Sequence, residues 1–153
     1  MAPSSVAARF ATAMTAVSAR LPFGAGRIVD GTVVGYLLIN GTTFAVDLSL
    51  LTALHGGLGW PLPLAITAGY GTAFGLSYLL NRVLNFRSHG DVGAQLAVYV
   101  PVVVVNYLVW ILGVGDGLAA AGLDYRLARV LAGVGEAVFM YSALRWLVFR
   151  RRA

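Results

Sequence analysis

Two acidic side chains of this chain lie deep inside long apolar segments. Asp47 stands somewhat beyond the middle of the apolar run 33–54, and Glu136 stands near the middle of the run 127–149. A carboxyl group at the centre of a membrane costs about 2.5–3.5 kcal/mol on insertion scales, so it normally faces a partner or a water-filled cavity. Two interpretations stay open for each residue. It is either a neutral carboxyl group bonded to a neighbouring helix, or a site that binds hydroxyl groups or a proton.

Further polar residues share a helix face with Asp47. Asn40 precedes it by two helical turns and Thr43 lies between them, so the three residues form a polar line on an otherwise apolar helix. Asn106 is a lone amide in a later apolar run. Such amides either bond neighbouring helices together or contact a ligand. We regard Asn40, Thr43, Asp47 and Glu136 as candidate residues of a polar pathway.

Arginines stand at the ends of the apolar runs. Arg82, Arg87 and Arg145 occupy such ends, and Asn81 adjoins the first of them. The bias of membrane proteins toward cytoplasmic arginine explains this placement by itself. Arginine is also the preferred bidentate ligand of phosphate. Arg82 and Arg145 lie slightly inside the ends of their runs, so they are the best phosphate candidates, with Asn81 and Arg87 beside them.

These two arginines belong to an internal duplication. The decapeptides 78–87 and 141–150 share Tyr, Arg, Leu, Phe and Arg at identical spacing, with an offset of 141 − 78 = 63 residues. A repeat is best recognised first because it determines the architecture. Here it predicts two similar units that cross an apolar layer and end on the same basic side.

The composition indicates a membrane protein. The chain of 153 residues has 59% hydrophobic and 11% charged residues, and its mean hydropathy is +0.80. A soluble domain carries about 25% charged residues. Four apolar segments approach the roughly 20 residues that span a bilayer; they run over about 33–54, 61–80, 94–114 and 127–149. The sequence therefore predicts an all-α membrane protein with four transmembrane helices.

The offset aligns the first span with the third and the second with the fourth. Each repeat is therefore a helical hairpin, and the two hairpins share one orientation. We expect the connections at His55–Pro61 and Gly113–Asp124. The spacing of Gly71 and Gly75 favours close helix packing in the second span. Arginine is concentrated in the N-terminal segment, the central loop and the C-terminus, which puts both termini in the cytoplasm.

Residues 1–31 differ from the rest, and residues 32–153 form the predicted transmembrane domain. Apolar residues recur at helical spacing in the first segment, which suggests either an amphipathic helix on the cytoplasmic face or a disordered segment. The chain has no cysteine, and no catalytic, nucleotide-binding or metal-binding motif occurs. We expect no enzymatic activity, no metal and no cofactor. Lipid contact explains the net charge of +5 better than nucleic acid does.

The combined pattern resembles the GtrA-like family of small four-span membrane proteins. The residues that carry the resemblance are Gly41 and Asp47 in the first span, Asn81-Arg82 and Phe86 at the end of the second, and Arg145-Trp146, Val148 and Phe149 at the end of the fourth. The resemblance covers about Gly35 to Arg150. Two departures are Leu144, which replaces the asparagine matching Asn81, and Asn40, where the family often has glycine.

The resemblance implies a flippase that moves polyprenyl-phosphate-linked sugar across the bacterial cytoplasmic membrane, for synthesis of cell-envelope polysaccharide or glycolipid. It also implies a glycosyltransferase partner, and the small size of the bundle suggests a homodimer. Two alternatives remain. One is a non-transporting membrane anchor or regulator of such a glycosyltransferase. The other is a small proton-coupled multidrug exporter that uses Asp47 or Glu136.

Overall fold

The structure is a computed structural model that describes residues 5–149. The side chains of a few residues within this range, Arg126 and Arg129 among them, lie outside the description, as do the C-terminal arginines 150–152. The described residues form helices and loops without a strand. The chain divides into two compact units, Met1–Arg87 and Ser88–Ala153, and each is described by itself.

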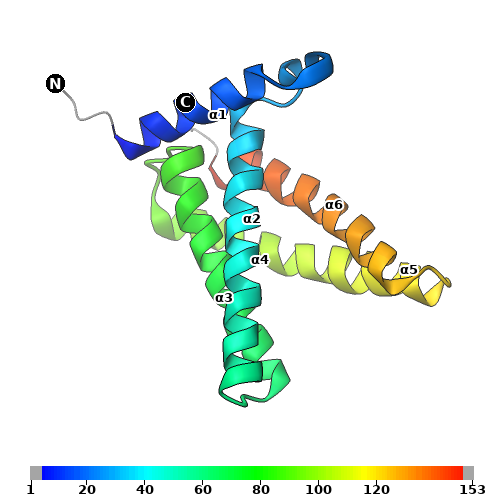
Figure 1. The fold of residues 1–153 in the computed structure, drawn as a ribbon. Coiled ribbons are helices and arrows are strands. Elements are labelled where there is room, and N and C mark those ends of the chain that lie inside the picture. Colours follow the sequence, from blue (N-terminus) through cyan, green and yellow to red (C-terminus); the bar gives the residue numbers. More distant parts are fainter. Residues whose placement is uncertain (1–4, 150–153) are drawn as a thin grey trace. The chain divides into compact units, whose positions relative to one another are not determined.

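The first unit is a helical hairpin with a helix across one end (Figure 1). Helix α1 covers Val6–Ala19 and is followed by the short 3-10 helix η1, Pro22–Arg27. Helix α2, Gly31–Leu51, continues into the π-helical segment η2, Thr52–Gly57. Helix α3, Leu62–Leu80, returns beside α2 and ends in a second π-helical segment, η3, Asn81–Asn85. Asp30 caps the start of α2 by accepting hydrogen bonds from the backbone N–H groups of Thr32 and Val33, at 2.9 and 3.0 Å.

Helix α1 packs on the start of α2 and on η3. A Cβ atom on Gly35 would lie 3.0 Å from the Phe10 ring, and one on Gly31 would lie 2.9 Å from the backbone nitrogen of Thr15. The buried hydroxyl of Ser18 donates to the backbone carbonyl of Val29. Two glycines without side chains thus allow α1 to lie against α2.

The second unit repeats the hairpin. Helix α4, Val92–Asn106, continues into the π-helical segment η4, Tyr107–Asp116, and the short helix α5, Gly117–Ala120. Helix α6, Tyr125–Ala143, packs on α4 and η4 and ends in the π-helical segment η5, Leu144–Val148. Asp91 caps α4 by accepting a 2.7 Å hydrogen bond from the Ala94 N–H.

The structure reproduces the sequence repeat. Helices α3 and α6, and the segments η3 and η5, begin and end at residues that correspond under the 63-residue offset. The turn of each hairpin contains a corresponding glycine with a positive φ, +68° at Gly59 and +96° at Gly122. Glycine adopts this left-handed conformation without steric cost, so it reverses the chain after a helix.

The connections expected at His55–Pro61 and Gly113–Asp124 start earlier in the chain than the loops of the structure do. Segment η2 extends the first helix through His55 to Gly57, and η4 with α5 extends the third through Gly113 to Ala120. Hydrogen-bonded helical turns satisfy the backbone up to the left-handed glycine, whereas the sequence shows only where hydrophobicity falls. Close helix packing at Gly71 and Gly75 stays a prediction. A Cβ atom on either would meet no described atom, whereas one on Gly69 would meet α2.

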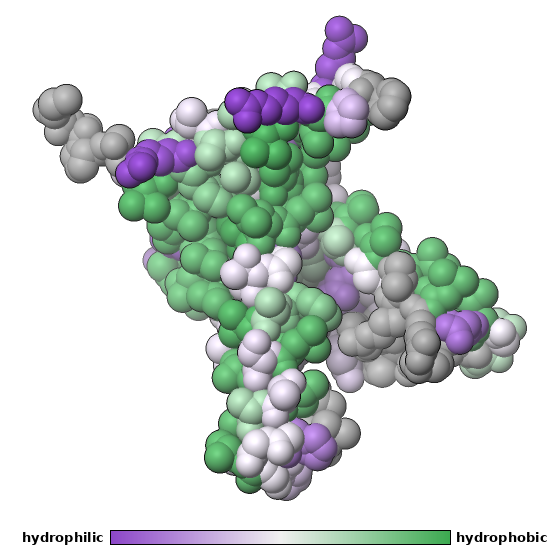
Figure 2. Space-filling model, viewed as in Figure 1, coloured by the Kyte–Doolittle hydropathy of each residue, from purple (hydrophilic) through white to green (hydrophobic). Residues whose placement is uncertain are grey.

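Among the described residues, three helical segments are long and apolar enough to cross a membrane: Gly31–Gly57, Val92–Gly115 and Leu131–Val148. The remaining expected span, 61–80, coincides with helix α3, and its crossing stays a prediction. Figure 2 shows that the visible surface of the α2–α3 hairpin is mostly apolar, while hydrophilic residues gather on α1 and at the hairpin turn. The chain is a multi-pass membrane protein.

Candidate functional site

A chain of hydrogen-bonded polar side chains joins α2 to α3 and η3. We call Asn40, Ser77, Asn81 and Asn85 the amide chain. The Ser77 hydroxyl donates to Asn40 Oδ1 at 2.9 Å, and Asn81 Nδ2 donates to the Ser77 carbonyl and hydroxyl at 3.0 and 3.3 Å. Asn85 Nδ2 donates to Asn81 Oδ1 at 3.1 Å and to the Thr32 carbonyl at 3.0 Å. The chain thus crosses from α3 to α2 at both of its ends.

The amide chain is buried where its members meet. Asn81 is 0% exposed and Ser77 is 6% exposed. A Cβ atom on Gly35 would overlap Asn85 Oδ1, so the glycine is what lets this amide lie against α2. These contacts give Asn40 a partner on the neighbouring helix, which is one of the two interpretations left open for the amides above. The hydrogen bonds of Asn81 run to Ser77 and Asn85 of its own continuous helical segment. A ligand contact of either amide stays a prediction.

Two residues of the polar line predicted on α2, Thr43 and Asp47, have different surroundings. Thr43 is buried and donates to the Asn40 carbonyl at 3.1 Å, which is a local backbone contact. Asp47 lies further along α2 and faces Gly69 of α3, where a Cβ atom would stand 2.5 Å from Asp47 Oδ1. A glycine opposite a carboxylate brings the two helices close at that level. Asp47 is half-buried there.

Each of the two candidate phosphate arginines donates a hydrogen bond to the hydroxyl group of a tyrosine four residues earlier in the chain. Arg82 Nη1 donates to the hydroxyl of Tyr78, one turn earlier, at 3.3 Å. Arg145 Nη1 donates to the hydroxyl of Tyr141, and its guanidinium carbon lies 5.8 Å from the centre of that ring. A guanidinium has five N–H donors and the tyrosine takes one of them. Each arginine is therefore oriented at the end of its hairpin.

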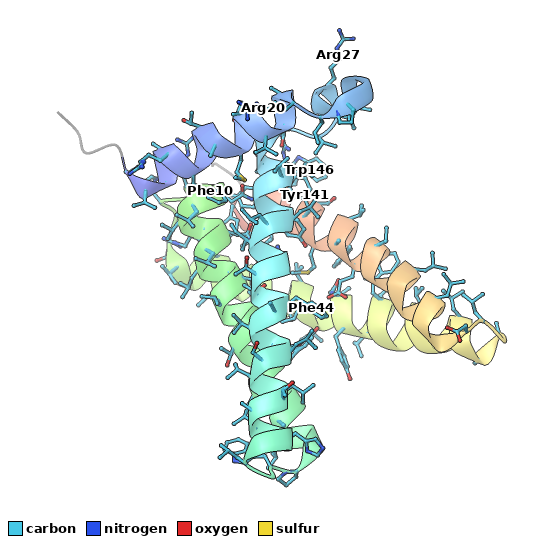
Figure 3. All side chains as sticks on the ribbon, viewed as in Figure 1. Phe10, Arg20, Arg27, Phe44, Tyr141 and Trp146 are labelled. Carbon is cyan, nitrogen blue, oxygen red and sulfur yellow. The ribbon has the colours of Figure 1, made fainter. Side chains whose placement is uncertain are left out.

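The two arginine–tyrosine pairs differ in burial. Tyr78 is 3% exposed and Arg82 is half-buried, whereas Arg145 is exposed. Arg87 is exposed just beyond η3, with a φ of +47° that ends the helical segment. In the first unit, Arg82 and Arg87 lie at the end that α1 covers, because α1 packs on η3. Figure 3 shows Arg20 and Arg27 near this same end, and Arg27 projects away from the hairpin.

Glu136 lies in the second unit and meets an amide there. Asn106 Nδ2 donates to Glu136 Oε1 at 2.9 Å, and Asn106 is 0% exposed. Trp110, one turn after Asn106, packs so closely on α6 that a Cβ atom on Gly135 would overlap its ring. Asn106 Oδ1 and Trp110 Nε1 are buried without a hydrogen-bond partner among the described residues.

Ser77 and Asn85 were not among the residues predicted from the sequence, and Asn81 was predicted only as a phosphate ligand. Ser77, Asn81 and Asn85 recur every four residues, a spacing that puts them on one helix face and could have revealed the amide chain. Trp110 was not considered as a hydrogen-bond donor. No pattern within the sequence pairs Asn106 with Glu136, since they are brought together only when α4 packs on α6.

The described residues define a class: a helical, multi-pass membrane protein with an oriented arginine in each of two corresponding helical segments, η3 and η5. Residues 35–149 match the family described as GtrA/DPMS, transmembrane domain, and the chain belongs to that family. No curated protein and no solved structure matches the chain. Family membership connects the protein with processes that involve polyprenyl-phosphate sugars.

Proposed function

We propose that this protein is a flippase that moves polyprenyl-phosphate-linked sugar across the bacterial cytoplasmic membrane, and that it has no enzymatic activity. The observation that carries the proposal is the duplicated arginine–tyrosine pair, Tyr78–Arg82 and Tyr141–Arg145. A guanidinium fixed at a helix end offers bidentate geometry to a phosphate. Such a group binds the phosphate of a lipid whose apolar tail stays in the bilayer.

The topology proposed for this function has four spans and cytoplasmic termini. The basic end of the first unit supports it, because α1, which carries Arg9 and is followed by Arg20 and Arg27, packs at the same end as Arg82 and Arg87. An excess of arginine on one side of short spans favours the cytoplasmic side. The lipid-linked sugar is made on that side by the proposed glycosyltransferase partner. We also propose that the protein acts as a homodimer.

Reconstitution in liposomes tests the flippase. The purified full chain is incorporated into vesicles that contain a labelled polyprenyl-phosphate glucose, and access of an external reagent to the sugar is followed with time. We expect transfer between leaflets that is lost or reduced about tenfold or more in Arg82→Ala, because a charge-assisted hydrogen bond contributes about 1.5–3 kcal/mol. Arg20→Ala is the matched control, since Arg20 follows the last residue of α1 and lies outside the duplicated pairs.

The outcome separates the alternatives. Vesicles without transfer, combined with co-purification of a glycosyltransferase, would favour the non-transporting anchor. Transfer that persists unchanged in Arg82→Ala and in Arg145→Ala would contradict the phosphate assignment. Proton release on addition of an organic cation, abolished by Asp47→Asn or Glu136→Gln, would favour the exporter.

A further inference from the structure

The second unit contains a polar cluster that the described side chains of that unit do not complete. Asn106 is fully buried, and its Nδ2 donates to Glu136 Oε1 at 2.9 Å. Its Oδ1 is an acceptor without a donor among the described residues, and the nearby indole Nε1–H of Trp110 is a donor without an acceptor. Buried polar groups in native proteins are bonded in the great majority of cases, so an unmatched pair calls for a missing partner.

The unmatched pair has a definite complement. Asn106 and Trp110 are four residues apart in a continuous helical segment, so their side chains lie on one face. A hydroxyl group donates one hydrogen bond and accepts others, so a single hydroxyl satisfies both the amide oxygen and the indole N–H. The Glu136 carboxyl group beside them accepts from a second hydroxyl. A ligand with adjacent hydroxyl groups fits this arrangement.

The indole is held in place by backbone, which makes the cluster a preformed arrangement. The Trp110 ring lies against α6 at Gly135, where any Cβ atom would overlap it. Gly133, two residues earlier on the same helix, faces no described atom. Small residues let an aromatic ring approach a neighbouring helix backbone. The missing side chain at position 135 therefore leaves room for the Trp110 ring against α6.

We propose that Asn106, Trp110 and Glu136 form a binding site for the sugar hydroxyl groups of the transported lipid. The identity of the ligand rests on the proposed flippase function, whereas the chemistry of the site rests on the unmatched donor and acceptor. Under the repeat offset the corresponding residues of the first unit are Thr43, Asp47 and Ala73. The Thr43 hydroxyl is already bonded to the Asn40 carbonyl, so the site belongs to the second hairpin.

The fluorescence emission of Trp110 reports whether a ligand occupies the proposed site. Trp60 and Trp146 are 43% and 61% exposed, so Trp60→Phe with Trp146→Phe leaves Trp110 as the single indole at little structural cost. The full chain in lipid nanodiscs is titrated with polyprenyl-phosphate glucose, with bare polyprenyl phosphate, and with free glucose. We expect a saturable change in Trp110 emission with the sugar lipid and none with the bare lipid. Free glucose acts only at much higher concentration.

Substitutions then weaken the response. Asn106→Leu and Glu136→Gln each reduce apparent affinity for the sugar lipid about tenfold, as expected for one lost hydrogen bond in a buried site. Val104→Ala is the matched control, because Val104 is 51% exposed on the same helix, and it leaves the affinity unchanged. If Asn106→Leu does not fold, the emission titration of the protein that keeps Asn106 and Glu136 tests the site without this variant.

The outcomes separate this site from the flippase. An emission change of equal size with bare polyprenyl phosphate, or no change with any ligand because water alone fills the cluster, overturns the site. Liposome transfer that proceeds while Trp110 is silent leaves the flippase standing and rejects the site. A sugar-specific emission change in a protein that moves no lipid supports the site and rejects the flippase. An equal response to free glucose supports hydroxyl binding and rejects the lipid-linked ligand.

Discussion

The two hairpins share one helical frame but place their polar residues at different levels. In the first, Ser77, Asn81 and Asn85 form a closed chain that bonds α3 and η3 to α2. The corresponding residues of the second are Met140, Leu144 and Val148, which are buried and apolar. The second hairpin instead has Asn106 and Glu136 where the first has Thr43 and Ala73.

The polar residues of the two hairpins thus have different roles. The amide chain has matched donors and acceptors and bonds two helices, so it serves stability. Among the described residues, the cluster around Asn106 has one donor and one acceptor unmatched, which costs stability and is typical of a site kept for a ligand. The oriented arginines, by contrast, are present in both copies. The duplication thus preserved the helix ends and diversified the interior.

The largest expected effect is a difference in thermal stability between substitutions of two glycines of α2. Gly35→Val introduces a side chain where Asn85 and Phe10 already lie, whereas Gly41→Val enters open space. Overpacking costs about 1–3 kcal/mol, and separation of α1 and η3 from α2 adds to it. We expect Gly35→Val to lower the thermal midpoint in detergent by far more than Gly41→Val. Equal midpoints would contradict the close packing at Gly35.

The second prediction compares the unfolding free energies of variants that lose one of two buried amides, Asn81 or Asn106. Asn81→Leu gives the first hairpin the residue of the second, and it leaves Ser77 and Asn85 without their shared partner. We expect a loss of about 1–3 kcal/mol in unfolding free energy. Asn106→Leu removes one interhelical hydrogen bond, to Glu136, so its loss should be smaller, about 0.6–1.7 kcal/mol. Urea or SDS unfolding followed by circular dichroism measures both.

That comparison also has a reciprocal control. Leu144→Asn puts an amide among Met140 and Val148, where no polar side chain corresponds to Ser77 or Asn85. It should destabilise the protein even though it makes the two copies more alike. A stabilising effect of Leu144→Asn would break the contrast between the two interiors.

The third prediction concerns the two arginines. Arg82→Ala should weaken binding of a polyprenyl phosphate more than Arg145→Ala does, since Arg82 is half-buried and loses less binding energy to water and salt. Binding to protein in nanodiscs at low and high salt measures the difference. Arg82 binding should also be the less sensitive to salt. Identical losses at both salt concentrations would show that the two ends are equivalent.

The smallest effect is expected from the tyrosines. Tyr78→Phe and Tyr141→Phe remove only the hydroxyl that orients each arginine, so transfer should fall about two- to fivefold, in line with a neutral hydrogen bond of about 0.5–1 kcal/mol. Folding should be unchanged in both, as judged by circular dichroism. An additional loss in Arg82→Ala combined with Tyr78→Phe would show that Tyr78 acts independently of the arginine.

Much of the architecture was accessible from the amino-acid order. Long apolar runs require helices in a bilayer because only a helix or a closed barrel bonds every backbone group. The repeat of Tyr78–Arg87 in 141–150 predicted two similar hairpins, and the structure has α3 with η3 and α6 with η5 at corresponding residues. The arginines at the hairpin ends were likewise recognised as candidates from spacing alone.

Only the tertiary structure decided what the polar residues meet. Hydrophobicity shows that Asn40 and Asn106 lie within apolar helices, but it does not show that Ser77 faces the first and Glu136 the second. Those pairings depend on which faces of two helices meet and on how closely Gly35, Gly69 and Gly135 let them approach. A hydrogen bond depends on distances of a few ångströms between residues far apart in the chain. The sequence therefore determined the membrane helices and their duplication, whereas packing decided which side chain each buried amide bonds.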